Sequence, residues 1–172
     1  MKKFILVCAI LFIANAGCKK MNVDGGGGLC GCSPARTGPQ LNLVIKNAAG
    51  DDLLDNKSAG AYTKDKIELF RKDADGKVIP ILFAIRPPFS YGDEKFKFNQ
   101  LTTFEMSHIK SSSNNVIYLK LADKTYELTL QTKENPYLLD RVLIDQKEAE
   151  RDSGTVAKYT VIFYLSLSQQ SL

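Results

Sequence analysis

The pattern of hydrophobic and polar positions changes at Leu41, where apolar and polar residues begin to alternate. Leu41, Leu43 and Ile45 would share one face of a strand. Similar runs bounded by Gly, Asn, Asp and Ser predict further strands. These strands are expected at residues 66–71, 77–84, 95–99, 101–106, 116–121, 125–131 and 155–167, and residues 138–144 are compatible with a strand or a short helix. The last of these strands would place Val161, Phe163, Leu165 and Leu167 on one face.

Two short polar segments predict hairpin turns. Asp73–Gly76 places turn-forming residues at its first and fourth positions. A calcium loop would continue with spaced acids and a Glu, whereas Lys77-Val78-Ile79 follow here. Ala122–Lys124 separates two strand-like runs and predicts the second hairpin. Both segments are therefore interpreted as connections within antiparallel sheet.

Short strands at sandwich-like spacing predict an all-β fold, an antiparallel β-sandwich formed by a single domain of residues 41–172. The regular alternation of helices and strands that indicates a parallel sheet is missing. An immunoglobulin-like arrangement is one form this sandwich can take. The chain has no Trp, so the Cys–Trp–Cys signature of true immunoglobulin domains does not decide the matter.

The N-terminus has the order of a secretory signal. Lys2 and Lys3 precede an uninterrupted apolar run, Phe4–Ala14, and the small residues Ala16-Gly17 follow. A transmembrane helix needs about 20 apolar residues, and this run ends at Asn15. The pattern therefore predicts export.

The residues Asn15-Ala16-Gly17-Cys18 resemble the lipobox of bacterial lipoproteins. Asn15 stands where that family usually carries Leu or another apolar residue. The resemblance implies that residues 1–17 are a signal peptide and that Cys18 becomes the first residue. Its thiol would receive a diacylglyceryl group and its amino group a fatty acyl chain such as palmitate, which would anchor the protein to a membrane. Plain secretion remains the alternative.

The residues after Cys18 bear on location. Lys19 rather than Asp follows the cysteine, and by resemblance to Gram-negative envelope sorting this implies the outer membrane. Some Bacteroidota lipoproteins carry an acidic surface-export run at this place, and Lys19–Asn22 does not match it. A periplasmic-facing and a surface-facing position both stay open. Two or more acyl chains would make the attachment persistent.

Residues 18–40 are interpreted as a lipidated cysteine and a flexible tether. They include Gly25–Gly28 and show no hydrophobic period. The coil would reach roughly 25 Å. A phosphate-binding loop would need a preceding strand, a following helix and a Lys-Ser/Thr pair, which this segment lacks.

Cys30 and Cys32 lie one residue apart in this tether. A disulfide between them would be possible in an oxidising envelope, but it would close a small, strained ring. A redox-active dithiol and two free thiols are the other readings. His108 would add only a third ligand, and structural zinc sites use four. No metal or cofactor is therefore expected.

Charge and catalytic residues narrow the function by exclusion. Without Lys2 and Lys3 the 23 basic residues become 21 against 19 acidic ones, or +2, which does not favour nucleic acid as partner. His108 is the only histidine, and no Gly-x-Ser-x-Gly motif accompanies it. The acidic pairs Asp51-Asp52 and Asp93-Glu94 are typical of solvated loops. The chain is therefore expected not to be an enzyme.

Binding is the remaining class of function. Tyr62, Phe89, Tyr91 and Tyr137 fall in or near predicted loops, and the stiff segment Pro87–Tyr91 makes Phe89 and Tyr91 the preferred binding residues. Alternatively, Phe89 plugs the end of the sandwich and Tyr91 caps it. We expect a membrane-anchored envelope lipoprotein with a binding or assembly role. Its partner would be another envelope protein, docked at a sheet edge, or a glycan, and a hydrolytic enzyme is the third reading.

One further resemblance concerns the beginning of the domain. The segments "IKNAAGDDLLD" and "YTKDKIELF" between Leu41 and Phe70 are similar to small uncharacterised lipoproteins of Bacteroidota. This resemblance implies no catalytic residue.

Overall fold

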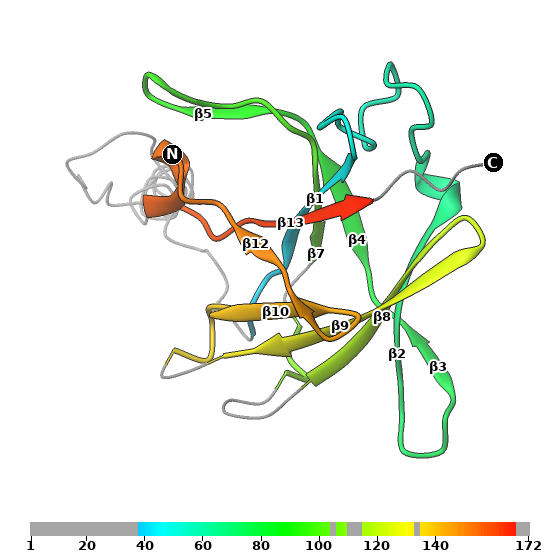
Figure 1. The fold of residues 1–172 in the computed structure, drawn as a ribbon. Helices are drawn as coiled ribbons and strands as arrows, with labels where there is room; N and C mark the ends of the chain where they lie inside the picture. Colours follow the sequence, from blue (N-terminus) through cyan, green and yellow to red (C-terminus); the bar gives the residue numbers. More distant parts are fainter. Residues whose placement is uncertain (1–37, 104–105, 110–114, 133–134, 168–172) are drawn as a thin grey trace, which may run out of the picture. The chain divides into compact units, whose positions relative to one another are not determined.

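The computed structural model describes residues 38–103, 106–109, 115–132 and 135–167. Two sheets pack face to face (Figure 1). One has the strand order β12-β13-β1-β7-β4, the other has the order β11-β10-β9-β8-β2-β3, and β5 and β6 form a separate hairpin. The strands are β1 Asn42–Asn47, β2 Ile67–Lys72, β3 Val78–Pro80, β4 Phe83–Arg86, β5 Phe89–Tyr91, β6 Glu94–Phe96, β7 Gln100–Thr103, β8 Asn115–Leu121, β9 Lys124–Gln131, β10 Arg141–Ile144, β11 Lys147–Glu148, β12 Glu150–Arg151 and β13 Phe163–Leu167.

The prediction of an all-β sandwich is confirmed. The helices of the described residues are two short 3-10 turns, η1 Lys64–Lys66 and η2 Thr155–Lys158. All described strand pairs are antiparallel except β1 and β13, which run parallel with Leu43 opposite Phe163. The immunoglobulin-like arrangement stays a prediction.

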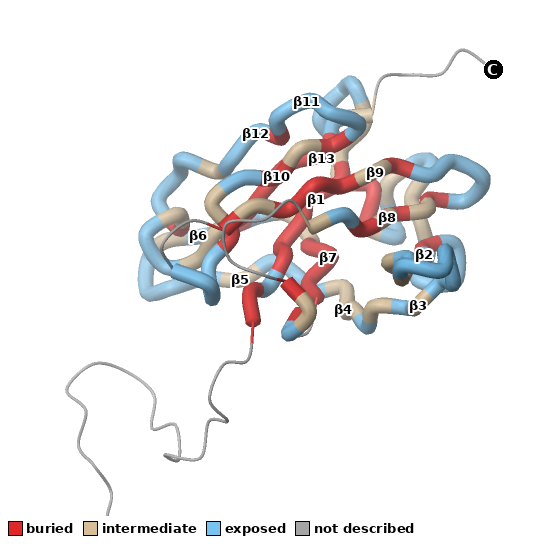
Figure 2. Tube along the Cα trace, turned by 90° about the horizontal axis from the view of Figure 1, so that it is seen from below, coloured by how far each residue is buried: buried red, intermediate tan, exposed pale blue. Residues whose placement is uncertain are grey.

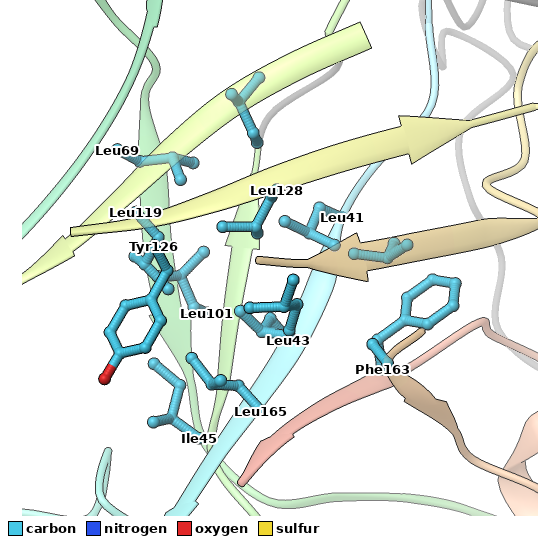
Figure 3. Close-up of a cluster of buried hydrophobic side chains, with 14 of the residues drawn as sticks. Leu41, Leu43, Ile45, Leu69, Leu101, Leu119, Tyr126, Leu128, Phe163 and Leu165 are labelled. Carbon is cyan, nitrogen blue, oxygen red and sulfur yellow. The ribbon is translucent and has the colours of Figure 1, made fainter. Parts of the chain in front are cut away.

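The main core lies between the two sheets, where the alternation predicted from the sequence places its apolar side chains. Leu41, Leu43 and Ile45 are fully buried on the inner face at β1. They face side chains such as Leu119 and Leu128 from the six-stranded sheet (Figure 3). Burying a Leu or Ile stabilises the folded state by about 1.5–3 kcal/mol. The period-two pattern is therefore explained by one buried face per strand.

A second apolar cluster covers the outer face of the five-stranded sheet. Val44, Ile162 and Tyr164 point to this face from β1 and the chain leading into β13, while Phe96 of β6 and Val156 of η2 pack onto them. The β5–β6 hairpin runs from the end of β4 towards the side where η2 lies (Figure 1). Because this cover buries the outer face, β1 is buried along successive residues and not only at every second one (Figure 2).

The expected strand at residues 77–84 is wrong in one respect, because the segment forms two strands in different sheets. β3 pairs with β2, and β4 pairs with β7. The chain crosses between the sheets at Ile81 and Leu82, and Leu82 is 72% exposed. The sequence does not predict where the chain passes from one sheet to the other, because the apolar run is continuous and strand propensity is the same on both sides of the crossing.

The expected strand at residues 155–167 is also shorter than predicted. Residues 155–158 form η2, and only residues 163–167 belong to β13. Val156 turns into the second apolar cluster, so tertiary packing overrides its strand propensity. The predicted face of β13 is confirmed, because Phe163 and Leu165 are buried in the main core and Val161 and Leu167 pack against it.

The structure bears out both predicted hairpin turns and places strands in two segments that the sequence left open or assigned to a loop. Asp73–Gly76 forms a turn in which Asp73 Oδ1 accepts hydrogen bonds from the backbone N–H of Asp75 and Lys77, at 3.0 and 2.9 Å. Ala122 and Asp123 connect β8 to β9. Residues 141–144 form a strand, which decides that ambiguity. The expected loop at residues 86–92 contains β5, because Phe89 and Tyr91 pair with β6.

Two residues of the predicted tether pack against the domain. Gly38 and Pro39 are buried and belong to the same compact unit as the other described residues. The Met106 N–H donates a hydrogen bond of 3.1 Å to the Pro39 carbonyl. A Cβ at Gly38 would collide with the Met106 carbonyl. The rest of the tether and the predicted signal peptide lie outside the described residues.

Candidate functional site

The segment proposed as a binding loop, Phe89–Tyr91, borders a pocket of about 430 Å³ on the outer face of the five-stranded sheet. Hairpin residues line the pocket together with Thr160, which belongs to the segment between η2 and β13. The lining residues are Asn42, Arg86, Pro87, Pro88, Phe89, Ser90, Tyr91, Gln100 and Thr160. A volume of this size is typical of small-molecule sites, which occupy about 300–1,000 Å³.

The polar residues at the base of the pocket come from adjacent strands. Gln100 of β7 lies opposite Arg86 of β4, and Thr102 of β7 lies opposite Asn42 of β1. All four alternate with inward-facing residues such as Leu43 and Leu101, so they point to the outer face. Gln100 and Asn42 are only 3% and 8% exposed. The sheet therefore presents buried amides to the pocket.

Asn42 is held in place by three hydrogen bonds. Its Nδ2 donates to the Val161 carbonyl at 3.0 Å and to Thr160 Oγ1 at 3.3 Å. Its Oδ1 accepts from Thr102 Oγ1 at 3.1 Å. A buried amide needs such partners, because an unpaired one would cost about 1–3 kcal/mol. This network fixes the segment between η2 and β13 against the base of the pocket.

The aromatic residues of the hairpin have two different environments. Phe89 is half-buried and stacks on Phe96, with ring centroids 5.3 Å apart. Tyr91 is 45% exposed, and its ring lies 4.6 Å from that of Tyr159, which is 52% exposed. Phe89 thus packs against the second apolar cluster on the outer face of the five-stranded sheet, while Tyr91 and Tyr159 present an exposed pair of rings.

Tyr159 also borders a smaller neighbouring pocket of about 70 Å³. Asn42 and Thr160 line both pockets, and Tyr137 and Leu138 line the smaller one. Of the four aromatic residues expected near loops, Phe89, Tyr91 and Tyr137 therefore surround two adjacent pockets. Tyr62 packs instead against the main core.

No family model matches this chain, and the searches of curated proteins and of solved structures found no match either. The function of the candidate site is therefore inferred from the geometry and chemistry of its residues.

Sequence reasoning missed most of the residues that line this pocket. Asn42 occupies a polar position of an alternating strand, which normally faces water, and Gln100 fell between two predicted strands. Arg86 carried no site prediction, and Tyr159 was assigned to a strand. No local signal identifies them, because they meet only when β1, β4 and β7 pair side by side.

The other candidate residues have different surroundings. His108 Nε2 is buried without a hydrogen-bond partner among the described residues. Burial, and then the charge of Arg71, lowers the pKa of His108. A catalytic histidine is usually paired with a carboxylate, whereas the charge beside this one is positive.

The two acidic pairs make structural contacts. Asp52 Oδ2 accepts hydrogen bonds from the N–H and Nδ2 of Asn99, at 2.6 and 2.9 Å. Asp51 Oδ2 accepts from Asn47 Nδ2 at 2.8 Å. Glu94 forms an ion pair with Lys158 at 3.4 Å. These contacts connect loops and strands, and the structure does not bring the two pairs to one site.

Within the described ranges, no group of three His, Cys, Asp or Glu side chains is placed to hold a metal ion. No helix in that part of the chain has the length and apolarity of a membrane span. Cys18, Cys30 and Cys32 lie outside these ranges, so the proposed lipidation and disulfide stay predictions.

A second polar cluster lies near β12 and β13. The Tyr164 hydroxyl donates a hydrogen bond of 2.7 Å to Asp152 Oδ1, and Lys46 Nζ lies 3.7 Å from the centre of the Tyr164 ring. Burial, and then this hydrogen bond, raises the pKa of Tyr164. The hydroxyl therefore stays protonated at neutral pH, and we interpret these contacts as connecting β1, β12 and β13.

Proposed function

We propose that this protein is a lipid-anchored lipoprotein of the outer membrane, facing the periplasm or the cell surface, and that it binds a glycan without catalysing a reaction. Lipid on Cys18 would hold it in the membrane. The segment after Cys18 would hold the β-sandwich at a distance from the headgroups.

The observation that carries the glycan proposal is the exposed Tyr91–Tyr159 pair beside the buried amides of Asn42 and Gln100. A sugar ring has apolar C–H faces and a rim of hydroxyl groups. Aromatic rings offer a flat apolar surface to such a face. An amide can both donate and accept hydrogen bonds, as hydroxyl groups require, and this role falls to Gln100, because Asn42 Nδ2 already donates both of its hydrogens within the protein. The pocket combines both kinds of group within one site.

The alternative of docking another envelope protein at a sheet edge receives less support. Edge strands that bind partners expose a row of backbone groups. The edge strands of the two sheets are short here, since β11 and β12 have two residues each, β3 has three, including Pro80, and β4 has four. Short edges of this kind are how proteins usually prevent strand addition.

Hydrolysis is the third candidate function. The pocket is lined by amides, hydroxyl groups, aromatic rings and one guanidinium. Glycoside hydrolysis relies on a pair of carboxyl groups flanking the scissile bond. The chemistry of this lining supports recognition of a ligand rather than acid–base catalysis.

A glycan array probed with the full chain in detergent would test the proposed binding. We expect binding to a subset of glycans, and we expect the Tyr91→Ala variant to lose it. Tyr118→Ala is the matched control, because Tyr118 also stacks on a neighbouring ring, that of Phe70, but belongs to the other sheet. Equal binding by wild type and Tyr91→Ala would contradict this function, as would no binding to any glycan.

A further inference from the structure

We propose that the glycan bound in this pocket carries a carboxylate, as uronic and sialic acids do, and that Arg86 recognises it. This inference rests on the proposed function of the pocket. It adds the chemical class of the ligand and names the residue that selects it.

The charge of the pocket favours a ligand that carries a carboxylate. Of the nine residues that line it, Arg86 alone is charged. Among the residues that the structure describes, no carboxylate forms an ion pair with Arg86. A neutral sugar would need no cation in its site, whereas a guanidinium matches the two oxygens of a carboxylate.

The position of Arg86 in the sheet holds its backbone firmly beside the pocket. It is the last residue of β4, and Pro87 and Pro88 follow it and line the same pocket. Each proline fixes its own backbone φ angle, which stiffens the chain at this point. Arg86 is therefore an exposed cation on a rigid support at the side of the pocket.

Arg86 has a neighbour, Gln100, whose side chain would add a second hydrogen-bond donor for a carboxylate. Gln100 lies directly opposite in the β4–β7 register and points to the same outer face. Its side chain is almost fully buried and lines the pocket. Together the two side chains provide adjacent guanidinium and amide N–H donors. A carboxylate can accept several such bonds at once, because each of its oxygens carries two lone pairs.

The remaining groups would recognise the body of the sugar. The exposed face of Tyr91 is available for the ring, and the Thr160 hydroxyl, which Asn42 holds in place, is available for the hydroxyl groups of the sugar. The carboxylate would then lie at the β4 side, and the ring would extend towards the Tyr91–Tyr159 pair.

The test compares matched acidic and neutral sugars by titration calorimetry with the full chain in detergent. The first pair of probes is two disaccharides of the same linkage, of which one ends in glucuronic acid and the other in glucose. The second pair is sialyllactose and lactose. We expect the acidic member of at least one pair to bind about tenfold more tightly, since hydrogen bonds to charged groups contribute more than neutral ones. Added salt should reduce this preference.

Variants assign the preference to Arg86. Arg86→Gln should bind both members of a pair with similar affinity, while Tyr91→Ala should bind neither. The matched control is Arg151→Gln, which changes the net charge equally but lies on β12, at the opposite edge of the same sheet. It should keep the wild-type preference.

The outcomes separate the inference from the function on which it rests. If neutral and acidic sugars bind equally, the carboxylate proposal is overturned and the glycan-binding function stands. If Arg86→Gln keeps the preference, the assignment to Arg86 is overturned. If neither member of either pair binds and the array is also blank, both proposals fail.

Discussion

Asn42 Nδ2 lies 3.0 Å from the carbonyl oxygen of Val161, so the side chain at the start of β1 holds the backbone that leads into β13. The same amide borders both pockets on the outer face of the five-stranded sheet. A contact between residues so distant in sequence makes the binding pocket depend on the integrity of the fold.

Replacing Asn42 with Ala should therefore reduce both stability and binding. The Val161 carbonyl and the Thr102 hydroxyl would lose their partner, which costs about 1–3 kcal/mol in unfolding free energy. Urea denaturation measures this loss. Asn56→Ala, at an exposed loop position, is the control and should unfold like the wild type. An Asn42→Ala variant of unchanged stability would contradict the role of this amide.

The exposed face of Tyr159 should contribute to ligand affinity. Tyr159→Ala removes the ring that packs beside Tyr91, and we expect about a three- to tenfold weaker affinity. Tyr159→Phe keeps the ring and should bind almost as the wild type does. Calorimetry with a glycan identified on the array distinguishes these cases. Equal losses in both variants would indicate that the hydroxyl rather than the ring makes the contact.

Gly38 should be required for the packing of the segment that precedes β1. In Gly38→Ala the new methyl group would collide with the Met106 carbonyl, and overpacking of this kind costs about 1–3 kcal/mol. The midpoint of thermal unfolding should fall accordingly. Gly154→Ala is the control, since its Cβ would meet the Asp152 carboxylate at an ordinary contact distance of 3.4 Å.

The stability of the domain should depend on pH through His108. Burial lowers the pKa of His108 in the folded state below its ordinary value of 6.5. The unfolded chain therefore binds a proton more readily, so the stability conferred by neutral His108 is present above pH 6.5 and is lost as the pH falls towards the lowered value.

A comparison with His108→Gln isolates this effect, because the chain contains no other histidine. The unfolding free energy of the wild type should fall relative to that of the variant as the pH is lowered from about 7.5 to about 5.5, which is about one unit on either side of the ordinary pKa of 6.5. A constant difference across this range would show that His108 does not titrate differently on folding.

Membrane attachment should depend on Cys18. The native protein is expected to carry a lipid mass and to sediment with membranes, whereas Cys18→Ala should do neither. Intact-mass analysis with membrane fractionation compares the two. If the wild type were soluble and free of lipid, the lipobox prediction would fail at Asn15, and the protein would be a secreted β-domain.

The sequence by itself determined the class of fold and the inner faces of the first and last strands. Leu43 and Phe163 were each assigned to one face of a strand, and that face is buried, because a strand with one buried side alternates with period two. The turns at Asp73–Gly76 and at Ala122 were predictable for a similar reason, since turn geometry selects residue types locally. Phe89 and Tyr91 were chosen as site residues because two aromatics follow two prolines in a polar context.

Only the tertiary structure decided what lies on the outer face of the five-stranded sheet. The sequence pattern places Asn42 on the solvent side of a strand and Gln100 between two strands, but the β5–β6 hairpin and η2 cover the sheet beside them. The split of residues 77–84 between two sheets was equally hidden, because strand propensity does not specify a partner. A pocket built from β1, β4, β5 and β7 arises from long-range pairing. Its residues have no common sequence signal, since each is local to a different strand.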